Sequence, residues 1–131
     1  MPNNSAYFSL DAIARMQNTA DELADEWRKS TKGDVGAGWS RLDGAARYEP
    51  EVAYAAILRA VEFELTPEQI SVLAAGPLEV LLSQHGPNFI ERVESEAAKN
   101  ARFNYLLGGV WRLGMTEDVW SRVKKARRET W

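Results

Sequence analysis

The chain has 131 residues, 45% hydrophobic and 27% charged, which suits one folded domain with its own core and excludes a disordered segment. It contains no Cys, which excludes disulfides and thiolate metal sites and suits a reducing compartment such as the cytoplasm. No basic and apolar leader and no run of about eighteen apolar residues occurs, so we expect neither standard export nor a membrane span.

The net charge of -3 is unevenly distributed along the chain. The first 111 residues hold 16 acidic and 10 basic side chains, whereas the last 20 hold six basic and three acidic ones. An acidic body disfavours nucleic acid as a partner, and basic residues near the end of a helix also complement its dipole. We therefore interpret the basic C-terminal helix as a stabilised helix end, with nucleic-acid binding as the alternative.

The first predicted element is a helix from about Ser9 to Lys29, in which apolar residues recur every three or four positions. A capping box at residues 19–22 leaves open whether this segment is one helix or two. We expect residues 1–8 to be flexible and residues 30–38 to form a Gly-rich connector. The predicted buried stripe of the helix consists of Leu10, Ile13, Ala20, Leu23, Ala24 and Trp27.

Three further helices are predicted between residues 39 and 75. Residues 39–46 have the spacing of one short helix face. Pro50 suits the first turn of a helix to about Glu64, and the several apolar faces of that helix predict a central position. Residues 66–69 combine an N-cap Thr, an N1 Pro and an N3 Gln, which predicts the start of a helix ending near Ala75.

Glycine and proline divide the rest of the chain. Gly76 and Pro77 predict a new helix that ends at His85, and residues 87–100 form the next one. Residues 101–111 keep helical spacing, although Gly108 and Gly109 either interrupt that helix or let a neighbour pack against its backbone. A final helix begins at residue 116.

No segment has the alternation of a strand, so we predict an all-α fold of six to eight short antiparallel helices. These helices form either a compact bundle or a solenoid-like fragment. The prediction treats residues 1–131 as a single domain. Of the five Trp residues, Trp27, Trp111 and Trp120 are predicted in the core, whereas Trp39 and Trp131 are candidates for exposure, with packing as the favoured alternative for Trp39.

Several segments together resemble a known family. They are L-A-A-G-P-L-E-V-L-L-S-Q-H-G at residues 73–86, F-I-E-R-V-E-S-E-A at residues 89–97, L-L-G-G-V-W at residues 106–111 and V-W-S-R-V at residues 119–123. The chain resembles, from about Tyr48 to Arg127, a small bacterial family known only as a domain of unknown function. The Trp39 region and the D-E-W of residues 25–27 resemble the more variable N-terminal part of that family. The resemblance implies a helical fold in a bacterial protein. It implies no activity and therefore no catalytic residue.

His85 is the only histidine, and its imidazole could act as an acid and base in a pocket with Glu79 or Glu91. This is the alternative of a small enzyme. A ring just before a helix-ending Gly can instead bond to the last carbonyls of a helix, which we favour. We expect no metal and no cofactor, because no H-x-x-x-H, Cys pair or calcium loop is present. The G-x-x-G-x-G of residues 33–38 lacks the preceding strand of a phosphate loop.

Acidic residues gathered on exposed helix faces would attract a basic protein and speed its association. We therefore interpret the chain as a non-enzymatic protein-binding module, an inhibitor such as a toxin-neutralising immunity protein or a phage anti-defence protein. Trp39 joins the acidic residues because exposed aromatics often anchor interfaces. The predicted partner-binding residues are Asp21, Glu22, Asp25, Glu26, Trp39, Glu62 and Glu64.

Overall fold

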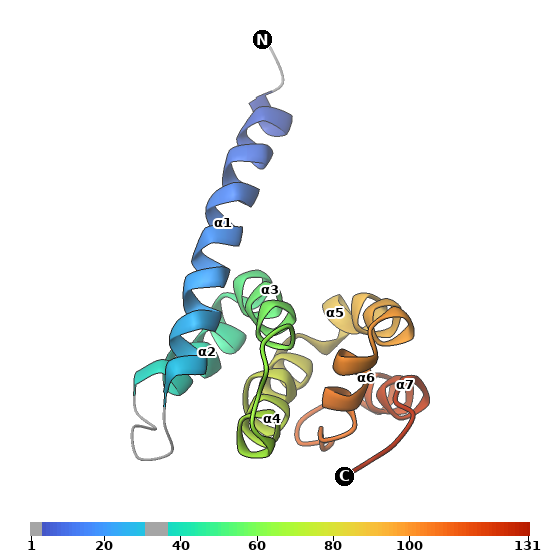
Figure 1. The fold of residues 1–131 in the computed structure, drawn as a ribbon. Coiled ribbons are helices and arrows are strands. Elements are labelled where there is room, and N and C mark those ends of the chain that lie inside the picture. The colour runs from blue at the N-terminus through green and yellow to red at the C-terminus, as the bar shows by residue number, and fades with distance from the viewer. Residues whose placement is uncertain (1–3, 31–36) are drawn as a thin grey trace.

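The computed structural model describes the backbone of residues 4–30 and 37–131 and the side chains of residues 10–30 and 41–131. These residues form helices and no strand, which confirms the all-α prediction (Figure 1). One helix is long rather than short, because α1 has 26 residues, whereas the 21 residues of α5 are divided by a kink at His85. The elements are α1 (Asn4–Lys29), α2 (Ala37–Tyr48), α3 (Pro50–Ala60), α4 (Pro67–Leu73), the π-helical segment η2 (Ala74–Leu78), α5 (Glu79–Lys99), α6 (Ala101–Leu107) and α7 (Glu117–Ala126).

The predictions for the first 38 residues are only partly covered by the description. Residues 1–3, predicted as flexible, and most of the predicted connector, residues 31–36, lie outside the described residues. The helix α1 begins at Asn4 and continues without a break. The hydroxyl of Thr19 donates to the carbonyl of Arg15 over 3.0 Å, so Thr19 bonds to the preceding turn and starts no second helix.

The lower half of α1 packs against α2 and α3, whereas its N-terminal half projects beyond them (Figure 1). The stripe members Ala20, Leu23, Ala24 and Trp27 are buried as predicted. The prediction is wrong for the other two members, because Leu10 is 71% exposed and Ile13 is 55% exposed. Their spacing is correct, but α1 has already left the body at this height, so nothing described covers them.

The helix α3 lies between α1 and the C-terminal half, as its apolar faces predict (Figure 1). Pro50 occupies its first turn. The ring of Tyr54 packs against Phe89 of α5 and Phe103 of α6, with centroids 5.4 and 6.4 Å away. Burial raises the pKa of the Tyr54 hydroxyl to about 12. The buried residues of α3 are Ala53, Tyr54, Ala56, Ile57 and Ala60.

The predicted helix boundary at Gly76 and Pro77 is wrong. The chain continues through η2, where the N–H of Glu79 donates to the carbonyl of Ala74, five residues back. This wider turn accommodates Pro77, which has no N–H to donate. Gly76 is no cap either. It lies where a Cβ atom would come 2.9 Å from the Asp43 carboxylate of α2, which would then have to move.

The predicted boundary at His85 is confirmed, because the two helical parts of α5 meet there at a kink whose backbone is not helical. His85 has φ -133° and ψ 18°, and the helix resumes through Pro87. A proline two residues later explains the kink, because its ring and missing N–H disturb the preceding turn. Gly86 faces α7, where an added Cβ would come within 2.9 Å of Val119. The kink thus permits close contact between α5 and α7.

The C-terminal part is held together by one buried amide. The side-chain nitrogen of Asn104 donates to the carbonyls of Ala97 and Ala126, over 3.1 and 3.0 Å. Its side-chain oxygen accepts from the N–H of Arg128 at 3.0 Å. Since a buried amide is costly without partners, these three bonds fix α6 against the ends of α5 and α7.

The sequence left open whether Gly108 and Gly109 interrupt the helix or let a neighbour pack against its backbone. In the structure they do both. The helix ends at Leu107, and Trp131 packs so closely on Gly109 that a Cβ there would overlap its ring. The prediction that Trp111 belongs to the core is wrong, because its side chain is 71% exposed. The chain has left the helix by this point, so helical spacing no longer predicts which residues are buried.

Candidate functional site

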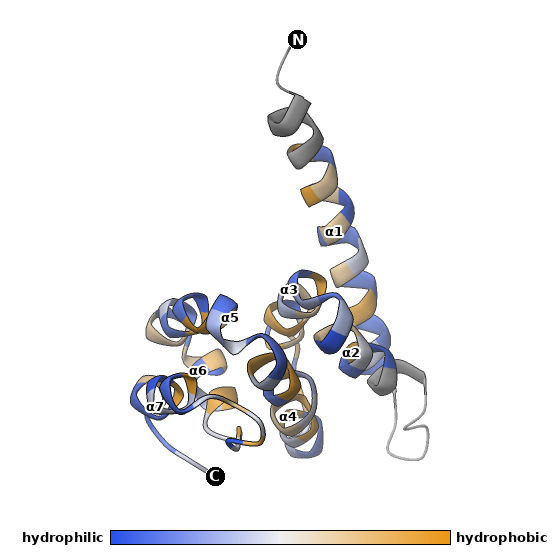
Figure 2. Cartoon of the chain, turned by 180° about the vertical axis from the view of Figure 1, so that it is seen from behind, coloured by the Kyte–Doolittle hydropathy of each residue, from blue (hydrophilic) through white to orange (hydrophobic). Residues whose placement is uncertain are grey.

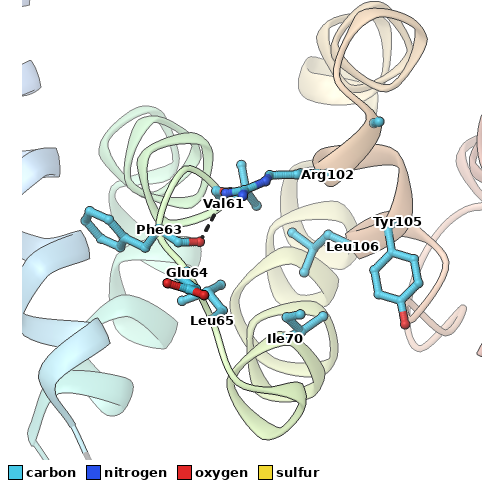
Figure 3. Close-up of a pocket in the computed structure, with 9 residues that line it drawn as sticks. Val61, Phe63, Glu64, Leu65, Ile70, Arg102, Tyr105 and Leu106 are labelled. Carbon is cyan, nitrogen blue, oxygen red and sulfur yellow. Dashed lines mark hydrogen bonds between the residues drawn. The ribbon is translucent and has the colours of Figure 1, made fainter.

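A groove of about 370 Å³ opens between the α3–α4 connection, α4 and α6 (Figure 3). This volume lies at the lower end of ordinary binding sites. Figure 3 shows Leu65, Ile70 and Leu106 around the centre of the groove. Its surface is mostly apolar. The lining residues are Val61, Phe63, Glu64, Leu65, Ile70, Ala101, Arg102, Tyr105 and Leu106.

Arg102 of α6 forms one end of the groove. Its Nη1 atom donates to the carbonyls of Val61, Glu62 and Phe63, over 3.2, 3.1 and 3.3 Å. These carbonyls follow the last turn of α3 and would otherwise lack partners. Arg102 therefore holds the α3–α4 connection against α6. Among the described residues, its Nε and Nη2 atoms make no hydrogen bond, so they remain available at the groove.

The other end of the groove adjoins a cluster of charges. Glu64 lines the groove and forms no ion pair with any described side chain. Arg59 of α3 binds Glu62 at 2.5 Å and lies 4.0 Å from Asp21 of α1. The structure thus brings together two of the predicted partner-binding acids, Asp21 and Glu62, although they come from two separate regions of the chain.

Of the other predicted partner-binding acids, two form ion pairs within the chain, which the sequence did not indicate. Asp25 binds both Arg28 and Lys29, at 2.6 and 2.8 Å, and these hydrogen bonds lower the pKa of its carboxyl. Glu26 binds Arg41 of α2 at 2.5 Å. Glu22 is exposed and has no ion pair among the described side chains. The Trp39 side chain lies outside the described residues. Ion pairing therefore reduces the acidic character of this face.

Two arginines lie over the ring of Phe63 at the border of the groove. The guanidinium groups of Arg28 and Arg59 lie 4.5 and 5.0 Å from the centre of its ring. Such contacts favour a fixed ring position. In addition, the side chain of Gln69 donates to the carbonyl of Arg28 over 3.0 Å and also closes the capping box with Thr66. The C-terminal end of α1 and the start of α4 are thereby joined beside the groove.

The alternative pocket at His85 has a different arrangement. Its Nε2 atom lies 2.8 Å from the carbonyl of Arg47, and because a carbonyl only accepts, this nitrogen carries the proton. The imidazole therefore bonds to the C-terminal end of α2, rather than to its own helix. Among the described residues, neither Glu79 nor Glu91 bonds to it. Moreover, His85 is not part of the groove.

Glu79 is buried beneath the loop that follows α6. Burial raises the pKa of its carboxyl, and a hydrogen bond from the backbone of Trp111 partly opposes that rise. Nearby, the N–H of Gly114 donates to the Ser83 hydroxyl over 3.3 Å. Both contacts fix the loop to the first half of α5. They explain Glu79 as a structural contact, whereas Glu91 is exposed on α5.

The basic residues of α7 are partly occupied by contacts within the chain. Arg122 binds both oxygens of Glu94 in α5, at 2.9 and 2.5 Å, and this pairing lowers the pKa of Glu94. Arg127 donates to the carbonyl of Val110 over 2.9 Å and lies over the Trp120 ring. Lys124 also lies over that ring. These contacts give three of the basic residues partners within the chain.

The described residues include no group of His, Cys, Asp and Glu side chains that could hold a metal ion. Within the same part of the chain, no helix combines the length and the apolar character needed to cross a bilayer.

A family model described as "Family of unknown function (DUF6869)" matches residues 27–131. The chain belongs to this family. The DUF6869 region includes the groove and every helix except most of α1, and it contains both the resemblance at residues 48–127 and the Trp39 region that precedes it. No curated protein and no solved structure matches the chain.

Sequence reasoning missed most of the groove in this DUF6869 chain. Arg102 and Tyr105 were treated as parts of a packed helix, and Leu65 and Ile70 had no assigned role. The three carbonyls that Arg102 contacts lie 39 to 41 residues earlier in the sequence. No local signal reveals such a contact. The only groove residue that the sequence nominated is Glu64.

Proposed function

We propose that this chain is a non-enzymatic protein-binding module that inhibits a partner by occupying one of its surfaces. The observation that carries this proposal is the open apolar groove with the unpaired carboxylate of Glu64 at its edge. Toxin-neutralising immunity proteins and phage anti-defence proteins act in this way. We further propose a bacterial cytoplasmic setting, which a chain without Cys suits.

The groove suits an apolar side chain from a partner better than it suits a reaction. It gathers aliphatic surface from three elements, and burying such surface contributes roughly 25 cal/mol per Å². Its polar groups are Arg102 and Glu64 at the ends and the hydroxyl of Tyr105. No nucleophile paired with a base lines it, which disfavours catalysis there.

The charges at the rim favour a basic segment next to that apolar anchor. Glu64 has no arginine bound to it, whereas Glu62 and Asp21 share Arg59. A cationic side chain of the partner would gain the interaction that Glu64 lacks. Rim charges act mainly on association rate and selectivity, so this effect should weaken as salt concentration rises.

The decisive experiment compares two arginine substitutions. Ala101→Arg adds a long cationic side chain to an exposed wall of the groove, and Ala98→Arg makes the same change at an exposed alanine of α5 outside it. Wild type and both variants are immobilised and exposed to lysate of the source organism. Mass spectrometry then compares the retained proteins. We expect one stoichiometric protein to bind wild type and Ala98→Arg, and to bind Ala101→Arg at least about tenfold more weakly.

The retained protein is next purified and its own activity is titrated with wild type and both variants. Inhibition by wild type and Ala98→Arg, with loss for Ala101→Arg, supports the proposal. Equal retention by Ala101→Arg would remove the groove from it, and the absence of any stoichiometric partner would overturn it. Circular dichroism of both variants verifies that they remain folded, since both positions lie outside the core.

A second pair of variants tests the acidic rim. Glu64→Lys reverses the charge at the groove, and Glu68→Lys reverses an exposed charge on α4 that does not line it. We expect Glu64→Lys to reduce the association rate with the captured partner more than Glu68→Lys does, and the difference to shrink at high salt. Equal effects would show that only overall charge matters.

A further inference from the structure

The guanidinium group of Arg102 is held on one side and free on the other. Its Nη1 atom donates to the carbonyls of Val61, Glu62 and Phe63, which fixes the group against the α3–α4 connection. Figure 3 shows the side chain reaching from α6 across to this connection. The Nε and Nη2 atoms form another edge of the planar group, and no described residue accepts from them. This edge is therefore held in position before any ligand binds.

The free edge has the geometry of a carboxylate site. The N–H bonds of Nε and Nη2 run parallel, and together they match the two oxygens of a carboxylate. The same edge is used elsewhere in this chain, because Nε and Nη2 of Arg122 donate to the two oxygens of Glu94, over 2.9 and 2.5 Å. At Arg122 the carboxylate comes from the chain itself. At Arg102 the described residues supply none, so the matching carboxylate has to come from a ligand.

The charges of the groove narrow the class of ligand. Glu64 also lines the groove and is unpaired among the described side chains. A phosphate group carries roughly two negative charges, which Arg102 alone would not balance beside Glu64. A simple apolar acid would likewise meet Glu64 with no cation of its own. A ligand that combines one carboxylate with one cation complements both residues, and a peptide segment has this composition.

The shape of such a segment favours a chain end over an acidic side chain. In an extended peptide, neighbouring side chains point to opposite faces, so an Asp or Glu next to an apolar anchor would point away from the groove. A terminal carboxylate is attached to the anchor residue itself. Apolar surface for the anchor is available, because hydrophobic residues are concentrated in α3 and at the end of α6, beside which the groove opens (Figure 2).

We propose that the groove captures the C-terminal end of its partner, with the terminal carboxylate on the Nε and Nη2 atoms of Arg102. The last side chain of the partner is apolar and packs against Leu65, Ile70 and Leu106. A Lys or Arg further back in the partner pairs with Glu64. This inference rests on the proposed function, since it names the part of the partner that the groove binds. Capture of a terminal carboxylate is a recurring mode of peptide recognition.

The test uses two libraries of short acetylated peptides. All peptides end in Leu, Ile, Val, Phe or Trp after randomised positions, and the last residue has a free carboxylate in one library and an amide in the other. Immobilised wild type is exposed to each library, and mass spectrometry identifies the retained peptides. We expect retention of free acids that contain Lys or Arg before the end, with their amides binding at least about tenfold more weakly. Equal retention of both libraries, or retention of neither, overturns the proposal.

Octanoate is the probe for a small amphipathic acid, because it has a carboxylate and an apolar chain but no cation. It should bind at least about tenfold more weakly than a retained free-acid peptide, as measured by competition. Binding of octanoate as tight as that of the peptide would overturn the assignment to a chain end.

Arg102→Lys keeps the positive charge but removes the paired donors of the free edge. We expect this variant to lose the preference for free acids over amides. Arg122→Lys is the matched control, because it makes the same change at an arginine outside the groove whose edge already binds Glu94. It should keep the preference of wild type. Thermal unfolding followed by circular dichroism verifies that both variants are folded, and an unchanged preference in folded Arg102→Lys contradicts the proposal.

A further readout uses wild type alone, because Arg102 also holds the α3–α4 connection and its replacement affects stability. In nitrogen NMR, the Nε–H signal of Arg102 is the one that Arg102→Lys removes. It should shift when a retained free-acid peptide is added and stay in place with the corresponding amide. A signal that responds equally to both peptides would show that the carboxylate does not bind at this edge.

Failure of this inference can be distinguished from failure of the proposed function. The partner captured from lysate is prepared with and without its last few residues. If the shortened partner still binds wild type and still loses binding to Ala101→Arg, the groove binds an internal segment, so the proposed function stands and the inference falls. If free-acid peptides bind but the lysate yields no stoichiometric protein, the carboxylate site stands and the proposed function falls.

Discussion

The indole Nε1 of Trp131 donates a hydrogen bond to the carbonyl of Tyr105 over 2.7 Å, and the two rings stack with centroids 5.2 Å apart. The backbone N–H of Trp131 also donates to the carbonyl of Gly108, over 3.2 Å. Because Tyr105 lines the groove, the last residue of the chain supports one wall of the proposed binding site.

Gly109→Ala should destabilise the protein by about 1–3 kcal/mol, because the added methyl group would overlap the ring of Trp131. Denaturant unfolding measures this loss. Gly114→Ala is the matched control, since its methyl group would meet only the Ser83 Cβ at 3.7 Å. In a Trp131→Ala background the cost of Gly109→Ala should fall sharply. If Gly109→Ala destabilises the Trp131→Ala variant as much as the wild type, the added methyl group does not clash with the Trp131 ring.

The sequence predicted the starts of helices that depend on local capping. The side chain of Thr66 accepts from the N–H of Gln69, and that of Thr116 accepts from the N–H of Val119. Such caps involve residues three positions apart, so the sequence contains all the information needed. The predicted break at Pro77 is wrong. The free-energy cost of a proline inside a helix depends on the type of turn, and the π-helical turn of η2 accommodates Pro77.

The candidate site was less predictable than the fold. Glu62 and Glu64 were nominated from charge alone, but the position of Glu62 close to Asp21 depends on how α1 packs against α3. Trp111 illustrates the opposite error. Its spacing from Leu107 suits a helix face, yet two glycines separate these residues and the helix ends between them. Helical spacing predicts which residues are buried only within the helix itself.

Gly44→Ala should stabilise the protein by roughly 0.5–1 kcal/mol. Gly44 lies inside α2, and a Cβ there would meet no atom within 4 Å, so alanine would gain helix propensity without a clash. Thermal unfolding measures the gain. Gly76→Ala provides the contrast, because its Cβ would come 2.9 Å from the Asp43 carboxylate. Equal gains at both positions would show that the Asp43 carboxylate moves away without cost.

Glu51 of α3 and Arg92 of α5 should make a small contribution to stability that disappears in acid. Their two hydrogen bonds, of 2.8 and 2.6 Å, hold the pKa of Glu51 below its ordinary value of 4.5, although desolvation opposes this. A lowered pKa means that the contribution is present above the unfolded-state value and is lost as the pH falls through the folded-state value. Both side chains are largely exposed, which limits the contribution at neutral pH to about 0.2–1 kcal/mol.

The measurement is the difference in unfolding free energy between wild type and Glu51→Gln, taken at neutral pH and at about pH 3. We expect wild type to be more stable at neutral pH and the difference to shrink at the lower pH. Glu68→Gln is the control, because Glu68 is exposed and forms no ion pair with the described side chains. A difference for Glu51→Gln that is unchanged by pH would rule out the ion pair as its source.

Leu113→Gly should stabilise the protein, although it removes an apolar side chain. Leu113 has φ 47°, in the left-handed region, where a side chain costs roughly 1–2 kcal/mol. It is 66% exposed, so little packing is lost, and the greater freedom of glycine in the unfolded chain offsets only about 0.4–1 kcal/mol. Leu113→Ala retains the strain and should bring no gain. Denaturant unfolding measures both variants. If Leu113→Gly is destabilised as much as Leu113→Ala, the packing of the Leu113 side chain stabilises the loop beside Trp111 by more than the backbone strain costs.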